Sequence, residues 1–239
     1  RSWGYQSFDT AFKSTKDLVR KLVDIASKGG NFLLNVGPDS KGKFPPESIE
    51  RLKGIGAWMD ENGESIHGTF ASPFGPLPWG RCTRRTLPNG NERLYLHVFD
   101  QPKDGKLVLP GLMNRVASNG AHLLSDPGRA NSMTSRDGAD VVVSLPDELD
   151  DPIDTVYVLD IEGAAIVVSA PSISPESGAI FIDVVEVALT SPSANVSIRY
   201  TLDGSDPTGA SPAANGTTRL SNTATLRAKA AAITGNATE

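Results

Sequence analysis

A short apolar stretch between glycines is the sequence feature that most limits how this chain can fold. Residues 32–36 read Phe-Leu-Leu-Asn-Val, with Gly-Gly two positions before them and Gly-Pro after them. The run is too short for a helix and does not alternate strictly, which favours a strand buried on both faces. Amphipathic helices are predicted before it, over residues 14–28, and after it, over residues 46–62. This helix–strand–helix order predicts part of a parallel β/α structure.

Both predicted helices carry start and stop signals. Ser14 and Asp17 have the spacing of a capping box, and Gly29-Gly30 ends the first helix. Pro45-Pro46 introduces the second helix, because proline is tolerated in a first turn. Asn35 ends the predicted strand, at the edge where structures of this class place their active sites.

The pattern changes to short strands after a Pro/Gly cluster near residue 75, and a second boundary falls near residue 168. Short apolar runs between turn clusters predict two all-β regions. The runs of the first region are 94–99, 106–109, 121–124, 141–145 and 155–159, and those of the second are 179–182, 184–190, 196–202 and 224–232. We therefore predict three domains: a β/α segment over 1–75, a β-sandwich over 76–167, and a smaller, truncated β-sandwich over 168–239.

Composition excludes several function classes. The net charge of −5 argues against a broad affinity for nucleic acid or anionic membranes, and no apolar run is long enough to cross a bilayer. Cys82 is the only cysteine, so no internal disulfide can form. The three histidines lack metal-ligand spacing, and the acidic run at 147–151 lacks the pattern of a calcium loop. We expect no metal site and no membrane insertion.

The first third of the chain resembles glycoside hydrolase family 29, the α-L-fucosidases. Matching motifs follow one another in the order of that family. They include Ser2-Trp3-Gly4-Tyr5, Ser27-Lys28-Gly29-Gly30-Asn31, Leu33-Leu34-Asn35-Val36-Gly37-Pro38 and Asn62-Gly63-Glu64-Ser65-Ile66. Residues 198–208, Ile-Arg-Tyr-Thr-Leu-Asp-Gly-Ser-Asp-Pro-Thr, resemble the immunoglobulin-like C-terminal module of chitobiase-type secreted glycosidases.

The resemblance implies a multidomain fold: the C-terminal part of a (β/α)₈ barrel, a β-sandwich and a truncated immunoglobulin-like module. It also implies a retaining hydrolase in which an aspartate is the nucleophile and a glutamate the acid/base, without a metal or an organic cofactor. Both carboxylates precede the Ser2–Tyr5 motif in the family, so we assign no catalytic residue in this chain. About 75 residues are also too few for a barrel of about 250 residues. We expect an inactive fragment.

Three residues are expected at the sugar site by resemblance. The rings of Trp3 and Tyr5 offer apolar faces to a 6-deoxy sugar, although both rings could instead plug the rim of the barrel. Asn35 could bind the substrate or hold a catalytic carboxylate, but an asparagine that ends a buried strand more often satisfies amides of a loop.

Two functions are open at this point. The chain is expected to be part of an exo-acting α-L-fucosidase, a secreted or periplasmic enzyme that releases terminal fucose from fucosylated glycans. The alternative is a non-catalytic carbohydrate-binding or spacer protein whose β modules carry the function. The helix–strand–helix segment favours the enzyme, because a pure binding module has no use for a buried parallel strand.

Overall fold

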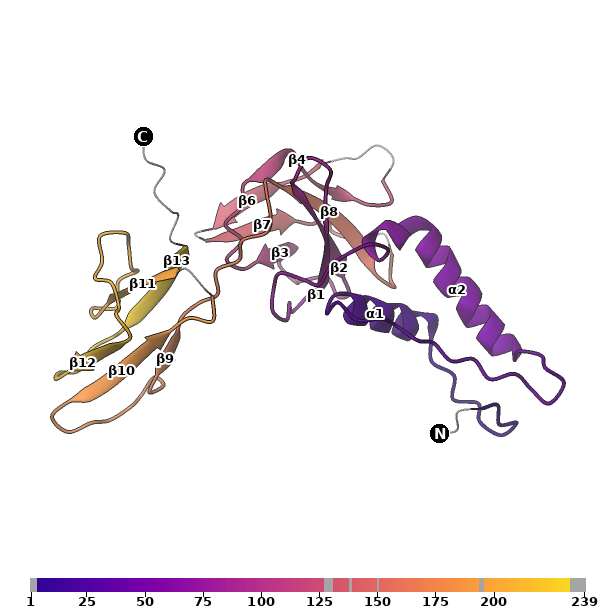
Figure 1. The fold of residues 1–239 in the computed structure, drawn as a ribbon, viewed down its shortest axis with the longest axis horizontal. Helices are drawn as coiled ribbons and strands as arrows, with labels where there is room; N and C mark the ends of the chain where they lie inside the picture. Colours follow the sequence, from indigo (N-terminus) through magenta and orange to yellow (C-terminus); the bar gives the residue numbers. More distant parts are fainter. Residues whose placement is uncertain (1–3, 127–130, 138, 150, 194–195, 233–239) are drawn as a thin grey trace. The chain divides into compact units, whose positions relative to one another are not determined.

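The protein is represented by a computed structural model that describes residues 4–126, 131–137, 139–149, 151–193 and 196–232 (Figure 1). The chain divides into two compact units. Unit 1 contains the chain up to Leu109 together with Asn114–Ala165, and unit 2 contains Pro110–Met113 and the chain from Ile166 onward.

Both predicted helices are confirmed in unit 1. Helix α1 (Thr15–Ala26) begins at Ser14, whose hydroxyl accepts a hydrogen bond of 3.0 Å from the Asp17 N–H. The Asp17 carboxylate accepts in return from the Ser14 N–H, which completes the capping box. Helix α2 (Pro46–Asn62) starts with proline at its first position and continues into the 3₁₀ turn η1 (Gly63–Ser65).

The strands of unit 1 pair antiparallel in two sheets, as expected for a β-sandwich. All five predicted runs are strands, with bounds shifted by a few residues. The larger sheet has the order β1 (Gly80–Thr86), β2 (Glu92–Val98), β8 (Thr155–Ile161), β4 (Val116–Leu123), β5 (Asn131–Ser132). The smaller sheet has the order β3 (Lys106–Leu109), β7 (Asp140–Ser144), β6 (Thr134–Asp137).

Unit 2 is a small immunoglobulin-like β domain. One sheet has the order β12 (Thr217–Leu220), β10 (Val185–Thr190), β9 (Ser172–Ser174), and β11 (Val196–Thr201) pairs with β13 (Arg227–Ala232). The strand predicted over 179–182 is wrong. Those residues lie outside every strand, and Ile180 and Ile182 are 98% and 89% exposed. Both sides of β10 are already taken by β12 and β9, so the run has no position beside β10.

The strand predicted at residues 32–36 is also absent from the described part of the chain. Residues 30–39 belong to no helix or strand, and Leu33 is 92% exposed. Phe32, Leu34 and Val36 are half-buried, so only one side of the segment is covered. A strand forms only by backbone pairing with at least one neighbouring strand, and the described residues supply none for this segment.

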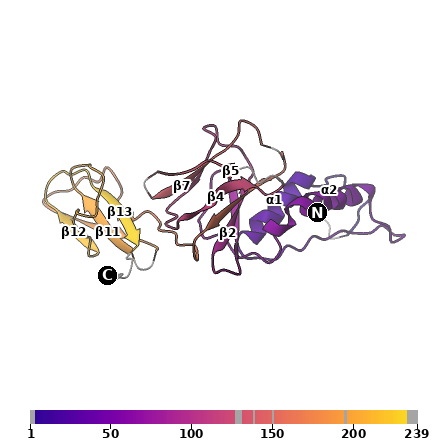
Figure 2. The same cartoon turned by 90° about the horizontal axis from the view of Figure 1, so that it is seen from above.

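The helices pack on the larger sheet through one apolar cluster. Its buried members are Val19 and Val23 of α1, Trp58 of α2, Tyr95 of β2, and Val156 and Val158 of β8. Figure 2 shows α1 and α2 side by side within this unit. Helices and sandwich therefore share one core.

Buried polar groups reinforce this junction. The Trp58 indole donates to the carbonyl oxygen of Asp154 at 3.2 Å, and Nδ1 of His97 lies 2.7 Å from Oδ2 of Asp154. Nε2 of His97 lies 3.4 Å from the hydroxyl of Thr83, which donates to the Ser65 carbonyl of η1. Burial raises the pKa of Asp154, and His97 opposes this shift.

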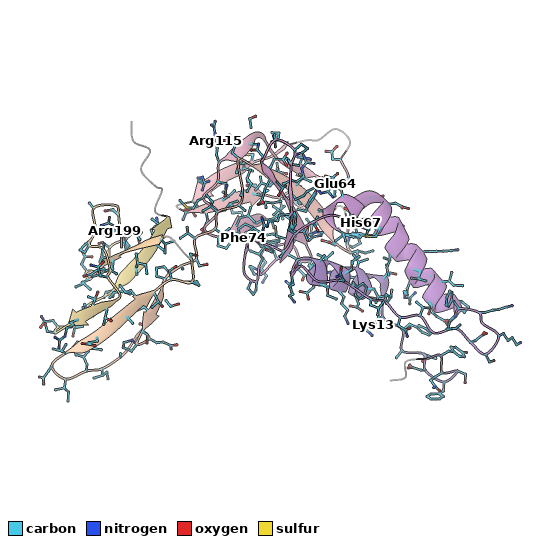
Figure 3. The ribbon with its side chains drawn as sticks, in the orientation of Figure 1. Lys13, Glu64, His67, Phe74, Arg115 and Arg199 are labelled. Atoms are coloured by element: carbon cyan, nitrogen blue, oxygen red, sulfur yellow. The ribbon has the colours of Figure 1, made fainter. Side chains whose placement is uncertain are left out.

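A second polar network joins the turn η1, which follows α2, to the sheet. Arg93 forms a two-pronged ion pair with Asp160, with N–O distances of 2.7 and 2.9 Å, and also contacts Glu64 at 3.0 Å. Glu64, which is labelled in Figure 3, accepts a hydrogen bond of 2.7 Å from the Tyr95 hydroxyl. Burial opposes ionisation of Asp160 and Glu64, but the bonds to Arg93 and Tyr95 outweigh it, so both pKa values are lowered.

Replacement of Leu33 tests the exposure of residues 30–39. We expect Leu33→Ala to change the free energy of unfolding of this chain by less than about 0.5 kcal/mol, because it removes little packing. Leu96→Ala is the matched control: Leu96 is fully buried, so its truncation should cost about 3 kcal/mol. Equal losses in urea unfolding would contradict the exposed position of Leu33.

Replacement of Arg93 tests the polar junction. Because the side chains of Arg93 and Asp160 are only 15% and 13% exposed, Arg93→Gln leaves a largely buried carboxylate unpaired. We expect a loss of about 3 kcal/mol in the free energy of unfolding. In the control Arg115→Gln, the lost pair with Glu162 is long and exposed, so the loss should stay below about 1 kcal/mol.

The two carboxylates bound by Arg93 predict that the stability of the chain depends on pH. Asp160 and Glu64 have lowered pKa values in the folded state, so their contribution is present above the unfolded-state values of about 4 and is lost as pH falls through the folded values. The gap in thermal midpoint between the unmodified chain and Arg93→Gln should therefore narrow on acidification from pH 6 to pH 3. A gap that widens would contradict the assignment.

Candidate functional site

Unit 1 contains a pocket of about 270 Å³ between four segments of the chain. One side is formed by residues 4–13, which we call the wall segment. Residues 34–37, the beginning of α2 and Leu18 of α1 complete the lining. The lining residues are Gly4, Tyr5, Gln6, Asp9, Ala11, Phe12, Lys13, Leu18, Leu34, Asn35, Val36, Gly37, Pro45, Ser48, Arg51 and Leu52.

Local sequence explains why these segments meet. The capping box at Ser14 ends the wall segment and starts α1. Pro45 and Pro46 start α2, which places Ser48, Arg51 and Leu52 on one face through i, i+3 and i+4 spacing. The pocket therefore depends on where the two helices begin.

The structure brings Tyr5 and Asn35 together in the lining of this pocket. They are 30 positions apart in the sequence, and the ring of Tyr5 is partly accessible, with the residue 43% exposed. Trp3, the third residue expected at the sugar site, lies outside the described residues.

The pocket has the chemical character of a site for a small polar ligand with an apolar face. Tyr5, Phe12 and Leu52 supply apolar surface, and Gln6, Asn35 and Ser48 supply hydrogen-bonding groups. Asp9 is the one carboxylate among the described lining residues, and its Oδ1 accepts from the Ala11 N–H at 3.0 Å. The described lining residues therefore contain no pair of facing carboxylates.

Sequence reasoning did not single out two residues that shape the pocket. Arg51 donates its Nε–H to the Lys13 carbonyl at 3.0 Å, and its i+3 spacing from Ser48 was the available signal. Gly37 touches the backbone of the wall segment: a Cβ added there would lie 2.7 Å from the nitrogen of Tyr5. No local pattern marks a contact across 32 residues.

The described residues give little support for a cysteine nucleophile, a metal site or a membrane-spanning helix. Burial raises the pKa of the Cys82 thiol, which disfavours a thiolate nucleophile. No group of three or more His, Cys, Asp or Glu side chains is arranged there to hold a metal ion. Neither α1 nor α2 is long and apolar enough to cross a membrane.

Comparison with known protein families identifies two segments of the chain. Residues 1–64 match the family described as alpha-L-fucosidase, and residues 175–239 match the chitobiase/beta-hexosaminidase C-terminal domain. The chain is 36% identical over 110 residues to an alpha-L-fucosidase of Dictyostelium discoideum, and 39% identical over 112 residues to the tissue alpha-L-fucosidase of Homo sapiens. Each alignment covers 45% of this chain and 23% of the relative, so the chain spans about a quarter of their length.

Solved fucosidases resemble the chain over a longer range. Alpha-L-fucosidase isoenzyme 1 of Paenibacillus thiaminolyticus is 37% identical with a TM-score of 0.59, over 68% of this chain and 38% of that protein. The Thermotoga maritima enzyme in complex with fucose is 28% identical with a TM-score of 0.55, over 66% and 37%. A trapped covalent intermediate of a Bacteroides thetaiotaomicron GH29 enzyme is 26% identical with a TM-score of 0.56, over 67% and 35%.

Both expected resemblances are thus confirmed: the chain carries an α-L-fucosidase family segment over residues 1–64 and a chitobiase/β-hexosaminidase C-terminal domain over residues 175–239.

Proposed function

We propose that this chain is the C-terminal part of a retaining, exo-acting α-L-fucosidase that releases terminal fucose from fucosylated glycans. The observation that carries the proposal is the family match over residues 1–64, which contains the wall segment and residues 34–37 of the pocket. Tyr5 and Asn35, with Trp3, are the proposed substrate-binding residues. A secreted or periplasmic location would bring such an enzyme to its glycans.

The segment of residues 30–39 would be a barrel strand within the longer protein. Its flanking helices α1 and α2 have the order of a (β/α)₈ unit, and its apolar residues include the exposed Leu33. Further exposed apolar residues lie in the same region, including Phe8 at 81% and Phe44 at 49%. Pairing with other barrel strands would cover such residues. This proposal divides the chain into barrel residues 1–75, a sandwich over 76–167 and a module over 168–239.

The chemistry of retaining hydrolysis requires two carboxyl groups about 5–5.5 Å apart, one as nucleophile and one as acid and then base. The covalent intermediate described for the Bacteroides relative is the species formed by such a nucleophile. With only Asp9 among the described lining carboxylates, the nucleophile and the acid/base would come from sequence before residue 1. The two carboxyl groups supply the whole reaction, so the proposal needs no metal and no organic cofactor.

Two measurements test the proposed function. Saturation-transfer NMR should show that the chain binds L-fucose in preference to D-fucose, its mirror image, because a shaped pocket distinguishes enantiomers. The purified chain should not hydrolyse an aryl α-L-fucoside, whereas the protein extended upstream through the rest of the catalytic domain should.

Turnover by the purified chain would overturn the placement of the two carboxylates. Equal transfer to both fucose enantiomers would remove support for the pocket as a fucose site. An inactive extended protein would contradict the proposed activity itself.

A further inference from the structure

We propose that Gly37 and Arg51 are positioning residues that hold the wall segment, residues 4–13, against the pocket. The inference rests on the proposed function only for the identity of the ligand. The position of the wall segment itself is a structural property of this chain.

The wall segment has little regular structure of its own. It contains no helix or strand, and hydrogen bonds within it are short-range, such as Asp9 N–H to the Gln6 carbonyl at 3.1 Å and Phe12 N–H to the Thr10 carbonyl at 3.0 Å. Nevertheless it supplies seven of the lining residues. Contacts with other segments must therefore fix its place in the pocket.

Gly37 fixes the beginning of the wall segment. A Cβ at this position would lie 2.7 Å from the nitrogen of Tyr5 and 3.0 Å from the carbonyl carbon of Gly4. Both are backbone atoms, so a side chain at position 37 would displace the wall segment rather than rotate a neighbour aside. The φ angle of Gly37 is outside the left-handed region, so the glycine is needed for space and not for its backbone conformation.

This contact also sets the distance between the two candidate sugar-binding residues. Gly37 follows Asn35 by two residues on one extended segment, and Gly37 touches the peptide that leads into Tyr5. A displacement at Gly37 therefore changes the separation between Tyr5 and Asn35. In a pocket built for one monosaccharide, such a shift weakens binding.

Arg51 fixes the other end of the wall segment. Its Nε–H donates to the carbonyl of Lys13, the residue before the cap of α1, and the guanidinium also pairs with Glu50 at 2.7 Å. The Arg51 side chain is 25% exposed, so this donor is partly shielded from water. The two positioning residues thus act on opposite ends of the same segment.

Chymotrypsin cleavage after Phe8 and Phe12 measures release of the wall segment in the full chain of 239 residues. For Gly37→Ala we expect cleavage about tenfold faster, because the added methyl overpacks a backbone contact. Gly56→Ala is the matched control, since a Cβ there also meets no atom within 4 Å and Gly56 lies outside the pocket lining, so its rate should be unchanged. Equal rates for the two variants would overturn the role of Gly37.

Arg51→Gln tests independently whether the wall segment is held in place, even if Gly37→Ala fails to fold. It should accelerate cleavage after Phe12 more than cleavage after Phe8, because it releases the end at Lys13. Lys53→Gln, on the exposed surface of the same helix, is its control. No difference between these two variants would overturn the role of Arg51.

Ligand binding separates positioning from a merely structural role. Gly37→Ala should raise the Kd for L-fucose about tenfold at an unchanged thermal midpoint, whereas Gly56→Ala, outside the pocket lining, should leave the Kd unchanged. A lower thermal midpoint with an unchanged Kd would mean that Gly37 serves stability alone. If the unmodified chain binds no L-fucose, the proposed function loses support, while the cleavage rates still decide whether the wall segment is held.

Discussion

The packing of α1 and α2 on the β2–β8 face is the contact on which the rest of unit 1 depends. Neither helix can bury its apolar side alone, and the sheet offers Tyr95, Val156 and Val158 to Val23 and Trp58. The contact also carries buried polar groups that are satisfied only when both parts are in place, such as the Trp58 indole on the Asp154 carbonyl. The sandwich is therefore part of the support of the pocket and not a separable appendage.

Local signals predicted the helices and most strands correctly. The Ser14–Asp17 capping box and the prolines before α2 act within a few residues, so the sequence alone reveals them. Residues 32–36 show the limit of this reasoning. Their composition predicts a strand, yet a strand exists only beside partners, and the described residues provide none. The strand prediction for residues 179–182 was wrong for the same reason, because β9 and β12 occupy both sides of β10.

The candidate site was predictable only through resemblance. Tyr5 and Asn35 meet in one pocket, but no periodicity links residues so far apart. Gly37 was present in a matching motif without a visible role, and the role of Arg51 was equally hidden, because these roles are contacts across 32 and 38 positions. The buried pair of His97 and Asp154, 57 positions apart, left no trace in the local pattern either.

Residues 30–39, which lie outside every helix and strand, have a consequence for how such an enzyme could be assembled. No strand of the described residues pairs with this segment, and Leu33 faces solvent beside helices that are already folded around their own core. Pairing with an added strand would cover Leu33 and convert the segment into a strand. If the remaining part of the proposed barrel were supplied as a separate polypeptide, its strands would complete this segment on binding, as the two halves of a split enzyme complete each other when they reassemble.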